Sequence, residues 1–145
     1  MSHHSAWITR PPRDVAGWAR CFEASSLPVL ASTAIALEEL RANEDAVDAH
    51  LLAEHFSTDP LMTLKLQAHV ARLRRGRDGS DPETVTAALV MTGISPFFRH
   101  FGPQPTVEDL LAEHPEALEG FRAVLARSHR AAHFALAIAV QRMDH

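Results

Sequence analysis

Two histidines near the C-terminal end of the chain have the spacing of metal ligands on a helix. His129 and His133 are four residues apart, so both side chains would lie on one helix face. The residues between them are Arg130-Ala131-Ala132, without the glutamate that zinc proteases place between two such histidines. The ten histidines are otherwise scattered along the chain. We therefore expect no metal site, and one packed and one solvent-facing or hydrogen-bonded imidazole; His129 and His133 stay the candidate ligands.

The chain has a single cluster of basic residues, composed of Arg72, Arg74, Arg75 and Arg77. Such a cluster could contact an anion, a nucleotide or a nucleic acid. However, the formal net charge of the chain is -4, and no aromatic residues are interleaved with the arginines. These features favour another role, in which cations at a helix end offset the helix dipole. The four arginines remain candidate contacts for an anion or a partner, and nucleic acid is not the favoured partner.

Other residue types form no recognisable catalytic set. Cys21 is the only cysteine, so no internal disulfide can form, and no base or orienting residue can be assigned to its thiol. The six glycines are dispersed, so the chain has no phosphate-binding glycine loop. We therefore expect no catalytic residues, no cofactor and no enzymatic activity.

Length and composition predict one soluble domain in the cytoplasm. The chain has 145 residues, of which 46% are hydrophobic and 22% are charged, as in an ordinary globular domain. No apolar leader is visible at the N-terminus. The longest apolar run, 131–140, has about half the length of a membrane span, so no membrane partner is expected. A lone cysteine fits a reducing compartment.

Helical spacing of apolar residues recurs along the chain, and no segment alternates as a strand would. Asp59-Pro60 is a strong start signal, because the carboxylate can accept from free amides of the first turn and proline already has a helical φ. Ser80 or Asp81 is expected to start another helix, with Pro82 in its first turn. The predicted helices span about 14–24, 29–42, 46–56, 60–75, 82–92, 95–101, 106–113 and 115–142.

These patterns predict an all-α fold: a single-domain bundle of about seven or eight helices. Pro11-Pro12 blocks a helix, so residues 1–12 are expected to form a flexible N-terminal arm and residues 13–145 the helical domain. Phe97 and Phe101 are expected in the core, with Phe98 or His100 at its outer edge. The helix that starts at Asp59-Pro60 is expected to continue through Leu61, Leu64, Leu66, Ala68 and Leu73. The last helix is expected to carry a stripe on one side, composed of Leu118, Phe121, Leu125, Ala132, Leu136 and Ala139.

Several segments together resemble one regulatory family. Leu27-Pro28 opens a helix, residues 52–66 read LAEHFSTDPLMTLKL, residues 84–94 read TVTAALVMTGI, and Ser128-His129 is followed by an alanine-rich helix. Over residues 27–140 this pattern resembles the N-terminal part of the HDOD domain, a bacterial signalling module related to HD-type phosphohydrolases. The resemblance implies an HDOD-like fold.

The chain also departs from the family pattern. Ala71-Arg72 stands where the family usually has an Asn-Ser pair, and the chain ends near the point where the family's second set of helices begins. The resemblance therefore implies a shortened domain, which would leave apolar surface uncovered around Phe134 and Ile138. Dimerisation is one way to cover such surface, and the choice between monomer and homodimer stays open.

The resemblance implies a non-catalytic module of signal transduction that recognises a protein or a small signalling ligand. The enzymatic relatives hold metal through several His and Asp ligands that include an adjacent His-Asp pair, which this chain lacks; only His129 matches a ligand position. Two alternatives stay open. One is a degenerate HD-type hydrolase that completes a metal site across a dimer, and the other is a nucleic-acid-binding helical domain that uses the arginine cluster.

Overall fold

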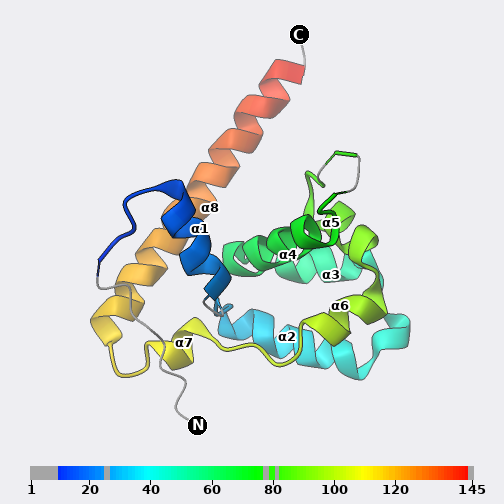
Figure 1. The fold of residues 1–145 in the computed structure, drawn as a ribbon, viewed down its shortest axis with the longest axis horizontal. Coiled ribbons are helices and arrows are strands. Elements are labelled where there is room, and N and C mark those ends of the chain that lie inside the picture. Colours follow the sequence, from blue (N-terminus) through cyan, green and yellow to red (C-terminus); the bar gives the residue numbers. More distant parts are fainter. Residues whose placement is uncertain (1–9, 25–26, 77–78, 81, 144–145) are drawn as a thin grey trace.

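The computed structural model describes residues 10–24, 27–76, 79–80 and 82–143. These residues form eight α-helices and one short 3₁₀-helix, with no β-strand among them (Figure 1). The elements are α1 (Val15–Ala24), α2 (Ala31–Ala42), η1 (Glu44–Ala46), α3 (Ala49–Phe56), α4 (Pro60–Leu73), α5 (Val85–Thr92), α6 (Ile94–His100), α7 (Val107–Leu110) and α8 (Pro115–Met143). The predicted all-α, multi-helix fold is confirmed.

The hydrophobic core lies between α2, α3, α4, α5 and α6. Helix α5 packs against α3 and α4, α6 follows against α5, and α2 contacts α3. The rings of Phe56 and Phe97 stack near its centre, with their centroids 5.8 Å apart. The largest fully buried apolar side chains are those of Leu37, Leu52, Phe56, Met62, Leu66, Leu89 and Phe97. These helices form the body of the molecule, and the other elements are arranged around it.

Three predicted helix starts are confirmed by hydrogen bonds to the capping side chain. Asp14 Oδ1 accepts from Gly17 N at 2.6 Å at the start of α1. Asp59 Oδ1 accepts from Leu61 N at 2.8 Å at the start of α4. The hydroxyl of Thr106 accepts from the third residue of α7, at 3.1 Å. The free amides of a first helical turn need such acceptors, so short polar side chains in these places locate the starts well.

The predicted start near Ser80 is wrong. Helix α5 begins at Val85, and Thr84 is its N-cap, with its hydroxyl 3.1 Å from Ala87 N. Pro82 therefore lies before the helix, because the threonine after it supplies the cap. Asp81, the other predicted cap, lies outside the described residues.

The helix predicted from residue 46 also begins later. Residues Glu44–Ala46 form the 3₁₀-helix η1, and α3 begins at Ala49. Asp48 caps α3, since its carboxylate accepts from Leu51 N at 2.8 Å. Asp48 is adjacent to the first residue of α3, so its short side chain can accept from a free amide of that helix. The acidic pair at residues 44–45 lies too far along the chain to act as this cap.

The packing of the helices determines which residues of α4 and α6 are buried. Met62, Leu66 and Val70 of α4 are buried, whereas Leu64, Ala68 and Leu73 are exposed. Of the two residues predicted as alternatives for the outer edge of the core, His100 is exposed, as that prediction allows, and Phe98 is buried, with 3% of its surface exposed. The guanidinium of Arg41 on α2 lies over this ring, 5.2 Å from the centroid, and donates to the carbonyls of Phe98 and Phe101 at 2.6 and 2.5 Å. The guanidinium therefore covers the face of the Phe98 ring and donates to carbonyl groups at the C-terminal end of α6.

The last helix, α8, is the longest, with 29 residues, and it contains no buried residue. The predicted stripe is half-buried only in its first part, at Leu118, Phe121 and Leu125, while Ala132 and Leu136 are exposed. Figure 1 shows the C-terminal part of α8 running alone, away from the body. The predicted helix is confirmed, and only the first part of its stripe lies against the rest of the structure.

Candidate functional site

A buried carboxylate joins two helices in the segment that carries the family resemblance. Asp59 is 1% exposed. Its Oδ1 caps α4 through Leu61 N and Met62 N, at 2.8 and 3.1 Å, and its Oδ2 accepts from Leu30 N at 2.9 Å, at the start of α2. One side chain therefore satisfies free amides at two helix N-termini, where its negative charge also suits both dipoles.

Other charged side chains complete this junction. The ammonium of Lys65, on the second turn of α4, donates to the carbonyl of Leu27. Burial lowers the pKa of Lys65, and the charge of Asp59 opposes that shift. Glu108 Oε2 accepts from Ala31 N at 2.9 Å. Asp59 and Lys65 of the Asp-Pro-x-x-Thr-x-Lys segment thus make contacts that hold the start of α2 against α4.

A short parallel pairing fastens the same region to α7. Val29 N donates to Pro105 O at 2.9 Å, and Val107 N donates to Val29 O at 2.9 Å. The chain entering α2 and the chain entering α7 therefore lie side by side, although they are distant in sequence. This pairing brings Glu108 to the first amides of α2.

The candidate metal ligands have separate environments. His129 Nε2 lies 2.8 Å from Thr58 O, a distance at which the ring N–H donates to the carbonyl. This contact ties the middle of α8 to the turn just before Asp59. His133 is exposed one turn further along α8. Among the described residues, no group of three or more His, Cys, Asp and Glu side chains could hold a metal ion.

The arginine cluster lies at the end of α4. The helix ends at Leu73, and Gly76 follows with a φ of 79°, the left-handed conformation expected of a glycine stop. Arg74 donates through Nη1 to the carbonyl of Ser80, across the loop. Arg72 and Arg75 are exposed, whereas Arg77 lies outside the described residues. One arginine of the cluster therefore closes the α4–α5 connection.

Sequence reasoning missed a stacked pair of imidazoles. His69 on α4 and His100 at the end of α6 have ring centroids 3.7 Å apart, and the edge of Phe101 contacts both rings. Burial lowers the pKa of both histidines, and the charge of Arg72 lowers both further. The folded protein therefore favours the neutral form of both imidazoles. Only the packing of α6 against α4 brings them together, and the sequence carries no spacing signal for it.

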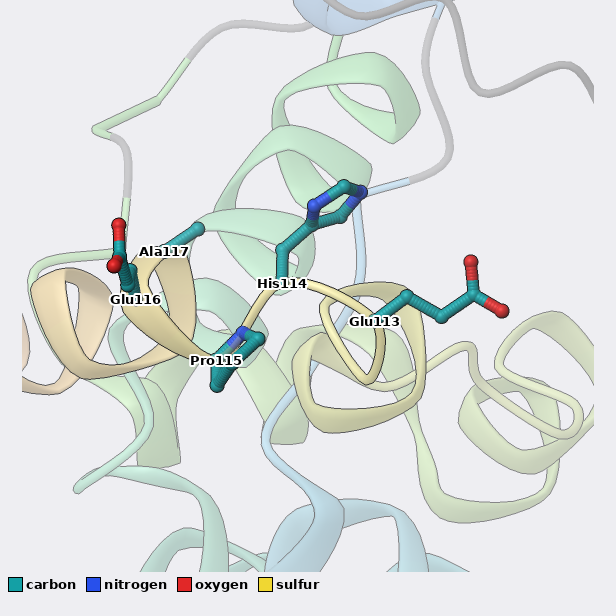
Figure 2. Close-up of a pocket in the computed structure, with 5 residues that line it drawn as sticks. All are labelled: Glu113, His114, Pro115, Glu116 and Ala117. Atoms are coloured by element: carbon teal, nitrogen blue, oxygen red, sulfur yellow. The ribbon is translucent and has the colours of Figure 1, made fainter.

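An open depression lies where α7 meets α8, lined by residues 113–117. Figure 2 shows its five labelled side chains, with the carboxylates of Glu113 and Glu116 on opposite sides and His114 between them. All five residues are exposed. Because the two carboxylates point apart, they do not converge on a shared ligand position.

The largest unexplained feature is the apolar end of α8. Its large apolar side chains are mostly exposed: Phe134 at 68%, Leu136 at 63%, Ile138 at 56%, Val140 at 51% and Met143 at 84%. Five alanines lie among them, at 131, 132, 135, 137 and 139. A helix that is apolar on every side is normally surrounded by other structure, and a contiguous apolar surface of this kind marks an interaction site.

Comparison of the chain with models of known protein families, with curated protein sequences and with solved structures finds no match. Among the described residues, no helix combines the length and the apolar content that crossing a membrane requires. The exposed apolar residues between Ala131 and Met143, here called the α8 surface, form the candidate binding site.

Proposed function

We propose that the chain is a non-catalytic regulatory module of bacterial signal transduction, HDOD-like in kind, which recognises a protein partner through the α8 surface. The observation that carries the proposal is the exposure of apolar side chains on every side of the last three turns of α8. Binding a partner would remove that surface from water, which is the main favourable term in most protein association.

The partner would be recognised as a helix is recognised by a groove. Ala131, Phe134, Ala135 and Ile138 follow the spacing i, i+3, i+4, i+7, so they lie together on one side, here called the outer face. Phe134 and Ile138 would be the anchors, and the small side chains of Ala131 and Ala135 beside them would let the partner approach closely. This is the anchor pattern of helix-in-groove recognition.

The roles of the polar residues also support a binding module. Asp59, Lys65 and His129 contact backbone groups that join α2, α4 and α8. Arg74 likewise closes a loop. These side chains hold parts of the structure together, and α8 projects from the body as a single helix (Figure 1).

The proposal is tested by partner capture with matched variants. The tagged full chain is used to capture proteins from the native cell, beside Phe134→Glu with Ile138→Glu, and beside Ile35→Glu. Ile35 is 61% exposed on α2, so its substitution introduces charge at an equally exposed apolar position elsewhere. We expect one stoichiometric partner that is lost with the α8 variants and retained with Ile35→Glu. Capture that is insensitive to Phe134 and Ile138 would contradict the proposal.

A second measurement addresses the enzymatic alternative. Metal content of the purified protein is determined, together with turnover of cyclic dinucleotides and of a generic phosphodiester. Stoichiometric metal with turnover that is lost in His129→Ala would replace the binding proposal by a hydrolase. Steeply salt-dependent nucleic-acid binding that is lost on charge reversal at Arg74 and Arg75 would replace it by a nucleic-acid-binding domain.

A further inference from the structure

The end of α8 has a second apolar face, whose centre lies about 120° around the helix from the centre of the outer face. Ala132, Leu136, Ala139 and Met143 follow the spacing i, i+4, i+7, i+11 and make one continuous stripe, here called the seam. At about 100° per residue, Leu136 lies about 200° around the helix from Phe134. All four seam residues are exposed, Met143 at 84%.

The body of the same chain covers this side of α8 only in its first half. Leu118, Phe121 and Leu125 belong to the same stripe and are half-buried, and His129 reaches the carbonyl of Thr58. Beyond His129 the residues of the stripe are all exposed, and Figure 1 shows the C-terminal part of α8 projecting away from the other helices. What pairs with the seam must therefore fit beside the last 13 or so residues of α8, about 20 Å of helix.

The spacing of the seam is the same when it is read in either direction. From Ala132 the steps are four, three and four residues to Met143, and they are four, three and four in reverse. A two-fold axis between residues 137 and 138 would therefore place every seam residue of one copy opposite a seam residue of another. An isologous interface requires this kind of self-complementarity.

The sizes of the facing side chains are complementary too. Under that two-fold axis Leu136 faces Ala139 of the second copy, and Ala132 faces Met143, so a large side chain meets a small one at each level. Such alternation lets two helices interdigitate at close approach. Arg130 and Arg142, the arginines nearest to the two ends of the seam, lie about 150° and 90° from its centre, and no acidic residue lies between 120 and 143. No like charges are buried in the contact.

We propose that the occupant of the seam is a second copy of this chain, and that two α8 ends pair antiparallel through Ala132, Leu136, Ala139 and Met143. The antiparallel arrangement aligns the helix dipoles favourably and points each C-terminal tip toward the body of the other copy. The outer face, with Phe134 and Ile138, stays open in this dimer. The inference therefore goes beyond the proposed function and does not depend on which protein the outer face binds.

The overlap is short compared with that of a standard interface, so the dimer is expected to exchange with monomer, with a dissociation constant on the order of micromolar. The solution mass of the full chain is measured by light scattering or sedimentation across a concentration series. We expect the mass to rise from the 16.0 kDa of one chain toward twice that value. Leu136→Glu should remain at the mass of one chain. Phe134→Glu, the matched control two residues away on the other side, should dimerise as the wild type does.

Cysteine cross-linking gives an independent readout that tests the register. In a Cys21→Ser background, mixing Leu136→Cys with Ala139→Cys chains is expected to give a disulfide-linked dimer under mild oxidation. Mixing Phe134→Cys with Ala139→Cys is expected to give little. Circular dichroism checks that each variant keeps its helices, which should hold because the substituted residues lie off the body.

A wild-type chain that stays at the mass of one copy throughout would overturn the proposal, as would a dimer that is lost in Phe134→Glu but kept in Leu136→Glu. These outcomes can be told apart from failure of the proposed function. If the chain is monomeric but its partner capture still depends on Phe134 and Ile138, only the proposed dimerisation through the seam is refuted. If the chain dimerises but shows no such capture, only the proposed partner binding through the outer face is refuted.

Discussion

At the scale of single residues, Asp59 caps two helix starts with one buried carboxylate. Its buried carboxylate accepts from amides of α2 and of α4, whereas Asp48 caps only α3. An aspartate followed by proline indicates a helix start from sequence alone. The contact to Leu30 N, 29 positions away, depends on how α2 meets α4, and no local pattern predicts it.

Replacing Asp59 should therefore cost much more stability than replacing an ordinary cap. Asp59→Ala removes the cap of α4 and leaves a second helix start unpaired in a buried place, so we expect a loss of about 2 to 4 kcal/mol in the free energy of unfolding. Asp48→Ala, at an exposed cap with one acceptor contact, should lose about 1 kcal/mol. Urea unfolding of both variants measures the difference, and equal losses would contradict the double role of Asp59.

The stacked histidines make stability depend on pH. In the unfolded chain each ring has its ordinary pKa of 6.5, whereas burial, Arg72 and the neighbouring ring lower the pKa of His69 in the folded chain, and burial, Arg72 and Lys65 lower that of His100. Below about pH 6.5 the unfolded chain therefore binds protons that the folded chain does not. Stability that is fully present above that pH should be lost as the pH falls, until the folded rings also become protonated.

This dependence can be measured as the melting temperature between about pH 5 and 8. We expect a fall toward acid pH in the wild type and a smaller fall in His100→Gln, where one titrating ring is absent and the other loses its neighbour. His55→Gln, at an exposed position on α3, should follow the wild type. If His100→Gln loses stability as steeply as the wild type, the pair is not the source of the pH dependence.

At the scale of helices and their connections, capping residues largely determine where each helix begins. Most starts follow from local chemistry, because Asp14, Asp59 and Thr106 accept from amides of the turn that they open. The prediction failed near Ser80, where Pro82 and Glu83 looked like a first turn and Thr84 supplied the cap. Several acceptors compete in such stretches, and the tertiary position of the helix selects among them.

The joint between α5 and α6 depends on a single glycine. Gly93 has a φ of 81°, between two helices that follow each other directly, whereas no added side chain would meet anything within 4 Å at Gly120 in α8. Gly93→Ala should therefore lose about 1 to 2 kcal/mol through the left-handed backbone. Gly120→Ala should be neutral or gain up to about 1 kcal/mol, because alanine favours the helix. Urea unfolding compares the two, and a neutral Gly93→Ala would argue that the joint relaxes freely.

At the scale of the whole molecule, the arrangement is a compact body that carries one projecting helix (Figure 1). The body is explained by its buried apolar residues and by the capping network around Asp59. Within the described part of the chain, nothing covers the end of α8 in the same way. The solution mass of the wild type, of Leu136→Glu and of Phe134→Glu measures whether a second copy covers this surface.

The sequence by itself determined the helical class, the number of helices and most of their ends, because spacing of apolar residues and capping chemistry act over a few neighbouring residues. Only the tertiary structure decided which stripe of α4 is buried, that Phe98 is in the core, that His69 and His100 stack, and that half of the α8 stripe lies bare. These depend on contacts between residues far apart in the chain. A periodic pattern shows that a helix has an apolar side, and the packing of the whole molecule determines whether anything covers it.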